Sequence, residues 1–450
     1  METREFINKL FARAAEKGLD ACEVYFESGS SFSASVFKGE IVDYSVSDGA
    51  GLGFRALVNG KMGYASTQAL DDESIEMLTD AAKTNAELIG SEDRQFLFGG
   101  GAAYEKLDIF SRAVADLTAA EKLKLARDME TKALALDSRI EQVENCGVFS
   151  ESRKVVIANT KGLDASYEAN IMGGYLAPVA KEDGEVSNAF KLFLTADPAE
   201  YDVDEMIAEA VSEATDGLHW EKPASGACPV VLRWDAMTSI LWKFSGIFSA
   251  DSAQKGMSLL KGREGEVIAA DCVTIVDDPH RAKAAGSMPF DGEGVPTYKK
   301  EIVRAGVLTT LMHNMMTANK QGVKTTANAS RASYSSPVGV SPSNFYIAPG
   351  EKVLDALLAE MGEGLLITGV QGLHSGANEI SGDFSLSARG YLVKNGVRGE
   401  AVRQITVAGN FYQLLKDIIR VGSDLRFGSA SNSNYASPSV LVKKLSVAGK

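Results

Sequence analysis

Apolar residues recur at two spacings along this chain, every three or four residues in some stretches and every second residue in others. The first spacing predicts helices that turn one face to a core, and the second predicts half-buried strands. Near the N-terminus, Phe6, Leu10 and Ala14 share one helical face, and Gly18 ends the pattern. The alternation that follows predicts five strands, at 21–27, 32–37, 41–47, 51–58 and 61–66.

Turn and capping signals set the limits of these elements. Asn59-Gly60 stands between the fourth and fifth strands, and this pair is a strong hairpin signal because the turn needs a positive φ at both positions. Asp71 or Asp72 is expected to cap a helix that reaches about Leu88. The first ninety residues therefore predict a helix–sheet–helix unit.

A second α+β unit follows an irregular segment at 90–112. Thr118 and Glu121 have the spacing of a capping box, which opens a helix to about residue 136. Asp202 and Glu205 have the same spacing and open a helix that reaches Gly217. The alternation between these helices predicts three or four long strands, at 140–150, 153–159, 165–179 and 186–195.

Short strands, glycines and hairpins dominate the remainder of the chain. A linker with Pro, Ser and Gly at 222–228 precedes a buried strand at 229–233 and a helix at 235–248. Further helices are expected at 351–360 and 410–421. We predict an α+β fold, with helix–sheet units followed by a β-rich, barrel-like domain. The predicted domains are an N-terminal α+β domain at 1–112, a central α+β domain at 113–221 and a β-rich C-terminal domain at 222–450.

Composition narrows the class of partner. Among 450 residues, 60 are acidic and 46 are basic, so the net charge is -14 at pH 7. Phosphate binding needs a basic surface, and we therefore expect no direct nucleic-acid partner. Charged residues interrupt every apolar run well before about 20 residues, the length of a membrane-spanning helix, so no membrane partner is expected. The four cysteines are scattered without a CxxC pair, which predicts reduced thiols and a cytoplasmic location.

Spacing excludes several catalytic constellations. No two histidines lie within ten residues of each other, so two of them cannot hold one zinc ion from adjacent helical turns. The nucleophile elbow GxSxG and the glycine-rich nucleotide fingerprints are absent. His374, Ser375 and Asp383 are triad residue types, but adjacent side chains point apart on an extended chain. These motifs predict no catalytic residue and no local metal site, while a site assembled from distant histidines stays open.

The segment Gly369–Asn410 is the main candidate for ligand contact. Three glycines surround His374, Asn378 follows, and Asp383 precedes a hairpin with an Asn395-Gly396 turn. Small residues let a backbone or a ligand approach closely, so we name His374, Asn378 and Asp383 as candidate substrate-binding residues. For His374, the alternative is a loop histidine that only holds the glycine-rich turns by hydrogen bonds.

Two further candidate substrate-binding residues lie upstream, Glu293 in FDGEGVPT and Arg331 after TTANAS. Asp291 and Glu293 carry oxygen ligands that suit a hard cation, but their spacing matches no EF-hand, and solvated turns are the alternative. The guanidinium of Arg331 suits a carboxylate ligand, and a surface salt bridge is the alternative.

The chain resembles the TldD/PmbA family, formerly called modulators of DNA gyrase. The runs that carry the resemblance span nearly the whole chain: GLGFRALVNGKMGYAST, FDGEGVPT, GLHSGANEISGDFSLSARGY and VGSDLRFGSASNSNYASPSVLVKKLSV. It implies an N-terminal α+β region, a β-rich C-terminal domain and the processing of unfolded peptides.

Zinc-binding members of that family carry an HExxxH helix, and the corresponding positions here are Leu241, Trp242 and Gly246. Those members also use a cysteine near the C-terminus, whereas Cys272 is the last cysteine of this chain. The resemblance therefore implies a PmbA/TldE-like subunit without its own cofactor, with zinc in a TldD-like peptidase partner. A homodimer of the isolated chain stays open. The alternatives are a self-sufficient metallopeptidase built around His374 and Asp383, and a non-enzymatic regulator that binds protein.

Overall fold

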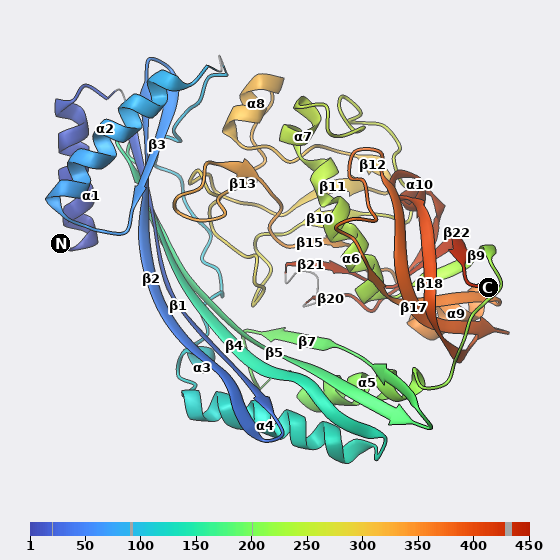
Figure 1. Ribbon diagram of the computed structural model, residues 1–450. Coiled ribbons are helices and arrows are strands. Elements are labelled where there is room, and N and C mark those ends of the chain that lie inside the picture. The colour runs from blue at the N-terminus through green and yellow to red at the C-terminus, as the bar shows by residue number, and fades with distance from the viewer. Residues whose placement is uncertain (20, 91–92, 200, 428–433) are drawn as a thin grey trace.

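The computed structural model describes residues 1–19, 21–90, 93–199, 201–427 and 434–450. Figure 1 shows a long, curved N-terminal sheet that faces a β-rich C-terminal domain across its concave side. The helices that pack on the sheet lie at its two ends. The predicted α+β class with a barrel in the C-terminal region is confirmed.

The N-terminal sheet has seven antiparallel strands in the order β3-β2-β1-β4-β5-β6, and β7 also pairs with β5. Strands from the first and central predicted units therefore share one sheet. The strands are β1 (Ala21–Phe37), β2 (Glu40–Val58), β3 (Lys61–Thr67), β4 (Ile140–Asn159), β5 (Asp164–Glu182), β6 (Glu185–Asn188) and β7 (Lys191–Thr195).

Several strands are longer than their polarity pattern predicted. The alternation stops at Ser28–Ser31, and the prediction of two strands there is wrong because β1 continues through the break. Gly29 pairs with Gly49 of β2 on one side and with Arg153 of β4 on the other. Backbone hydrogen bonds thus carry the strand through residues whose side chains do not alternate. β2 and β4 are continuous in the same way.

Helices at each end of the sheet cover two separate cores. At one end, α1 (Thr3–Glu16) and α2 (Asp72–Leu88) form a core with strands β1 and β2. Phe6 and Leu10 of α1 are completely buried in this core. α4 (Ala119–Leu136) and α5 (Val203–Asp216) cover the other end. A short helix, α3 (Arg112–Ala115), precedes them. The predicted caps are confirmed, because Asp71, Thr118 and Asp202 each accept a backbone N–H in the first turn.

A closed five-stranded barrel forms the centre of the C-terminal domain. Its strands follow the order β22-β9-β16-β17-β18, and β18 pairs back to β22. Two short strands extend this sheet, β8 (Trp220–Glu221) and β19 (Ile418–Val421). The barrel strands are β9 (Gly226–Leu232), β16 (Gly364–Gln371), β17 (Asp383–Lys394), β18 (Val397–Asn410) and β22 (Val440–Ala448).

A second sheet lies beside the barrel, in the order β12-β11-β10-β15-β21-β20. Its strands are β10 (Ile275–Asp277), β11 (Lys300–Arg304), β12 (Val307–Leu308), β15 (Phe345–Ile347), β20 (Arg426–Phe427) and β21 (Tyr435–Ser437). A separate pair is formed by β13 (Ala329–Ser330) and β14 (Gly339–Val340).

Two predicted helices of this domain are shorter than expected. The helix predicted at 235–248 is α6 (Trp234–Phe244), and a 3₁₀ turn, η1 (Ser245–Phe248), follows it. The helix predicted at 410–421 is α10 (Phe411–Asp417), because residues 418–421 pair with β22 as β19. The remaining helices are α7 (Ala250–Gln254), α8 (Met315–Gln321) and α9 (Leu354–Met361).

Candidate functional site

Helix α6 runs through the C-terminal core, and with the turn after it holds the positions that the family resemblance assigns to the zinc motif. Leu241 is completely buried in the largest apolar cluster, and Trp242 packs against that cluster. Gly246 follows in η1. None of these three side chains offers a metal-binding atom. Across the described ranges, no group of three or more His, Cys, Asp or Glu side chains is arranged to hold a metal ion. The residues present at α6 therefore do not fit zinc.

A groove of about 810 Å³ borders the end of this helix. Gly246 and Ile247 form one side, and the segment 375–385 forms the other, including the predicted residues Asn378 and Asp383. Lys243 and Glu379 join the two sides through an ion pair of 2.7 Å. The groove thus lies beside the position where the zinc motif would stand.

Asn378 and Asp383 organise the turn that forms the groove wall. The Asn378 side-chain oxygen accepts backbone N–H bonds from Ile380 and Ser381. Asp383 accepts hydrogen bonds of 2.8 Å from the side chains of Asn410 and Ser381, which lower the pKa of this carboxyl. These hydrogen bonds hold the turn in shape, and both Asn378 and Asp383 are exposed residues. His374 is also exposed and lies in the preceding turn.

Glu293 and Arg331 lie together in a different place, where the N-terminal sheet meets the C-terminal domain. The Arg331 side chain is 2% exposed and donates a 2.9 Å hydrogen bond to Glu23 of β1. Arg55 of β2 donates to the same Glu23 oxygen at 2.8 Å and lies 3.6 Å from Glu293. A surface salt bridge at Arg331 and a solvated turn at Glu293 are therefore wrong, since both groups belong to a buried ion network.

Burial changes the charge properties of the acidic members of this region. Burial, together with the neighbouring Glu293, raises the pKa of Asp291 to about 7. Burial also raises the pKa of Glu293, against the opposing field of Arg55. Asp291 accepts backbone N–H bonds from Glu293, Val295 and Ala329, so it holds the FDGEGVPT turn in place.

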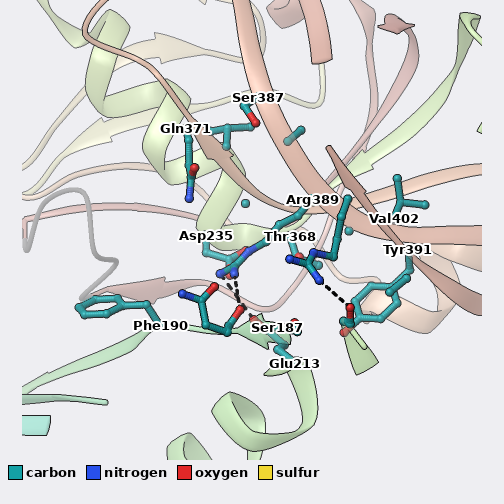
Figure 2. Close-up of a pocket in the computed structure, with 18 of the residues that line it drawn as sticks. Ser187, Phe190, Glu213, Asp235, Thr368, Gln371, Ser387, Arg389, Tyr391 and Val402 are labelled. Carbon is teal, nitrogen blue, oxygen red and sulfur yellow. Dashed lines mark hydrogen bonds and ion pairs between the residues drawn. The ribbon is translucent and has the colours of Figure 1, made fainter. Parts of the chain in front are cut away.

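A third feature was missed by the sequence interpretation. An interdomain pocket of about 540 Å³ lies between β6, β7 and α5 on one side and barrel strands β16, β17 and β18 on the other. Figure 2 shows Glu213, Asp235, Arg389 and Tyr391 around it. The sequence contained one sign of this pocket, the charged residue Arg389 within the alternating segment FSLSARGYLV. Its partners on β6 and α5 lie about 200 residues away, so this sign alone did not reveal a pocket.

Family models match three consecutive parts of the chain. Residues 22–86 match the PmbA/TldA metallopeptidase domain 1, residues 112–218 match the central domain, and residues 225–449 match the C-terminal domain. The chain belongs to the PmbA/TldD metallopeptidase family.

Curated relatives of this family align over nearly the whole chain. Metalloprotease PmbA of Escherichia coli O157:H7 is 26% identical over 96% of this chain and 93% of its own length. A PmbA homologue of Haemophilus influenzae is 27% identical over 100% of this chain and 96% of its own length. TldD homologues align as well, including one from Haemophilus influenzae at 25% identity over 97% of this chain and 93% of its own length.

Solved structures show the same architecture. A crystal structure described as a modulator of a DNA gyrase from Thermotoga maritima has a TM-score of 0.91 and 33% identity, covering 99% of this chain and 100% of that one. TldE from Thermococcus kodakarensis has a TM-score of 0.89 at 22% identity, covering 99% and 100%, and shares the fold. None of the helices in the described part of the chain is long and apolar enough to cross a membrane.

Proposed function

We propose that this chain is the zinc-free subunit of a TldD/TldE-type metallopeptidase assembly that cleaves unfolded peptides. The observation that carries the proposal is the complete burial of Leu241 on α6, where a family zinc peptidase has its motif. The position contributes packing instead of a ligand, and the exposed groove beside it remains. Zinc and the activated water would come from a TldD-like partner.

In this proposal the groove between η1 and residues 375–385 is a wall of the peptide chamber. Gly376 approaches the backbone so closely that a Cβ there would lie 2.3 Å from the Ser385 carbonyl oxygen. Such a thin, glycine-rich edge suits an extended peptide held through its main chain, with little selection by side chain. Asn378 and Asp383 keep this edge in shape, and His374 offers an exposed polar contact at its end.

We assign the partner surface to the free edge of β2. β3 pairs with β2 only from Leu52 onward, so residues 40–51 pair with β1 alone. Along this edge Val42, Tyr44 and Val46 are 60%, 51% and 59% exposed. A long unpaired strand with an exposed apolar row is a site for association unless something covers it. A second chain of this family would cover the row and supply the missing strand pairing.

Cys146, Cys228 and Cys272 are free thiols, which agrees with the cytoplasmic location included in the proposal. The function is tested with the purified chain alone, with its zinc-bearing partner alone, and with the mixed pair. Metal content by mass spectrometry and cleavage of an unfolded peptide are measured for each. We expect no stoichiometric zinc and no cleavage with this chain alone, and the fastest cleavage with the pair. Stoichiometric zinc together with cleavage by the isolated chain would overturn the proposal.

A further inference from the structure

Three neighbouring barrel strands depart from regular pairing at the wall of the interdomain pocket. The register of β16 on β17 shifts between Ile367 and Gly369. On β17 the shift falls between Ala388 and Gly390, which pair with Ile405 and Val402 of β18. Bulges of this kind are concentrated next to binding sites, where they redirect side chains.

The residues released by these shifts all line the pocket. They are Thr368 of β16, Arg389 of β17, and Arg403 and Gln404 of β18. Gln404 has a φ of 52°, a left-handed conformation that a side chain rarely adopts. Strained backbone persists where the surrounding structure enforces it, and such positions cluster at ligand sites. The barrel wall is therefore built to present two arginines at one level.

Charge in the pocket is unevenly distributed. Glu213 and Asp235 are its acidic residues, and each is matched by the cations Lys191 and Arg233. Burial opposes ionisation of both carboxyls, but Arg233 and Lys191 lower the pKa of each. Glu213 and Asp235 therefore stay charged at neutral pH.

Arg389 and Arg403 are two further cations of the pocket, in addition to those that pair with Glu213 and Asp235. Arg389 donates to the Asn188 carbonyl at 3.2 Å and lies 4.0 Å from Glu213. Arg403 donates to the carbonyls of Val186 and Gly217. Each guanidinium has five N–H donors in a planar fork, and these contacts use only part of them. The pocket thus has an excess of positive charge in a protein with a net charge of -14.

Open space lies beside Arg389. A Cβ added at Gly369 would come 3.1 Å from its Nε atom, so the glycine keeps that edge of the guanidinium accessible. Arg389 itself is 35% exposed. Phe190, which is 38% exposed, and the partly buried Val370 contribute apolar surface to the pocket. The volume of about 540 Å³ lies within the range of small-ligand sites.

We propose that the interdomain pocket binds a carboxylate group of a peptide, with Arg389 as its main contact and Arg403 in support. The nearby Glu213 and Asp235 disfavour a doubly charged phosphate, whereas a single carboxylate matches the excess charge and the planar fork. The apolar wall would receive the side chain next to the carboxylate. The peptide as ligand class rests on the proposed function, and the carboxylate rests on the pocket itself.

Two peptide sources share this chemistry, the C-terminal carboxylate and an acidic side chain. The test therefore measures binding of three hexapeptides of Gly, Ala and Ser to the full chain by calorimetry. One has a free C-terminus, one is C-terminally amidated, and one is amidated with a central Asp. We expect the free acid to bind about tenfold more tightly than the plain amide, as for one charge-assisted contact. Recovery of affinity in the Asp peptide identifies a side-chain carboxylate, and no recovery identifies the terminus.

Variants separate ligand contact from bridging between domains. Arg389→Gln should abolish the difference between acid and amide. Gly369→Ala leaves every charge and interdomain hydrogen bond in place, and it should reduce the difference by filling the space at Arg389. Arg420→Gln is the matched control and should keep the full difference, because Arg420 is an exposed arginine of β19, which extends the barrel sheet. Thermal unfolding of each variant checks its fold.

Two negative results have different meanings. If acid and amide bind equally to the wild-type chain, the carboxylate pocket is wrong while peptide binding by this subunit stands. If none of the hexapeptides binds, both the pocket and the proposed peptide-lining role fail. An unchanged acid preference in both Arg389→Gln and Gly369→Ala would place the carboxylate elsewhere and also overturn the pocket.

Discussion

Arg331 donates a 2.9 Å hydrogen bond to Glu23, a residue 308 positions earlier in the chain. This contact ties β1 of the N-terminal sheet to the segment after β13 in the C-terminal domain. Arg55 donates to the same carboxylate oxygen, and Glu293 lies opposite Arg55 at 3.6 Å. Two cations and two carboxylates are therefore buried where the two halves of the molecule meet. Each charge depends on its neighbours, because a buried charge without a partner is strongly unfavourable.

Replacing Arg331 by Met should destabilise the fold markedly. The change keeps much of the side-chain volume but leaves Glu23 with less compensation in a site closed to water. Breaking a buried pair in this way costs about 3–5 kcal/mol in typical cases. Urea unfolding followed by tryptophan fluorescence measures the effect. Arg4→Met is the control, because its 2.8 Å pair with Asp164 is more than half exposed and should shift the midpoint little. Equal shifts in the two variants would contradict the network's role.

Substitution of a glycine on β2 should also destabilise the fold. A Cβ at Gly53 would lie 1.9 Å from the backbone oxygen of Tyr334, which no side-chain movement can relieve. Gly53→Ala should therefore push the 333–334 segment off the sheet and cost about 1–3 kcal/mol, as overpacking does. Gly49→Ala lies on the same strand, where a Cβ meets nothing within 4 Å, and should leave stability nearly unchanged. Thermal unfolding midpoints compare the two, and a loss as large in Gly49→Ala would refute the explanation.

Features with a local physical cause could be predicted from the sequence. Asn395 and Gly396 have φ values of 53° and 75°, and this turn sets the β17–β18 hairpin as expected. Thr118 and Glu121 form the predicted capping box. In both cases a segment of two to four residues contains all the necessary chemistry.

Features that depend on distant segments could not be predicted. The closure of β18 on β22 and the continuity of β1 come from pairing partners, and the side-chain pattern does not record them. Glu293 looks like a loop residue in sequence, and only its position against Arg55 shows that it is buried. Asn378 and Asp383 are candidates because their loop is glycine-rich, whereas the place of Arg389 in the pocket wall depends on register shifts along three strands.

Asp291 in the FDGEGVPT turn should make the protein less stable as the pH rises toward neutrality. Asp291 has an ordinary pKa of 3.8 in the unfolded chain and about 7 when folded. Between these values the folded protein binds more protons than the unfolded chain, so stability decreases with rising pH and levels off above about 7. The slope from one such group is at most about 1.4 kcal/mol per pH unit. Glu293 is shifted in the same direction and adds to this slope.

Urea unfolding midpoints from pH 5 to pH 8 measure this dependence. In that window the carboxyls with a lowered pKa, such as Glu213 and Asp235, are largely ionised in both states and add little slope. Burial lowers the pKa of His313 from its ordinary 6.5, so this group adds a slope of opposite sign below that pH, and the Asp291 contribution is read from the comparison of wild type with variant. Asp291→Asn removes the titrating group and should flatten the dependence. The carboxylate accepts N–H bonds at both oxygens, whereas an amide has only one accepting oxygen and loses the bonds at its other end. Lower stability at every pH is therefore also expected. An unflattened dependence in this variant would show that another group carries the slope.

A lysine at Tyr44 should weaken association with the zinc-bearing partner. Tyr44 is at the centre of the exposed apolar row of β2, and its ring contacts Phe32 edge to face at a centroid distance of 5.6 Å. Burial of one large apolar side chain contributes about 1.5–3 kcal/mol, so Tyr44→Lys should weaken the pair about tenfold or more. Val397→Lys, at a position 67% exposed beside the Asn395-Gly396 turn, is the control and should leave the affinity unchanged. Analytical ultracentrifugation of the labelled chain with its partner gives the dissociation constants. If Val397→Lys weakens the pair and Tyr44→Lys does not, the partner docks on the barrel and the free edge of β2 has another role.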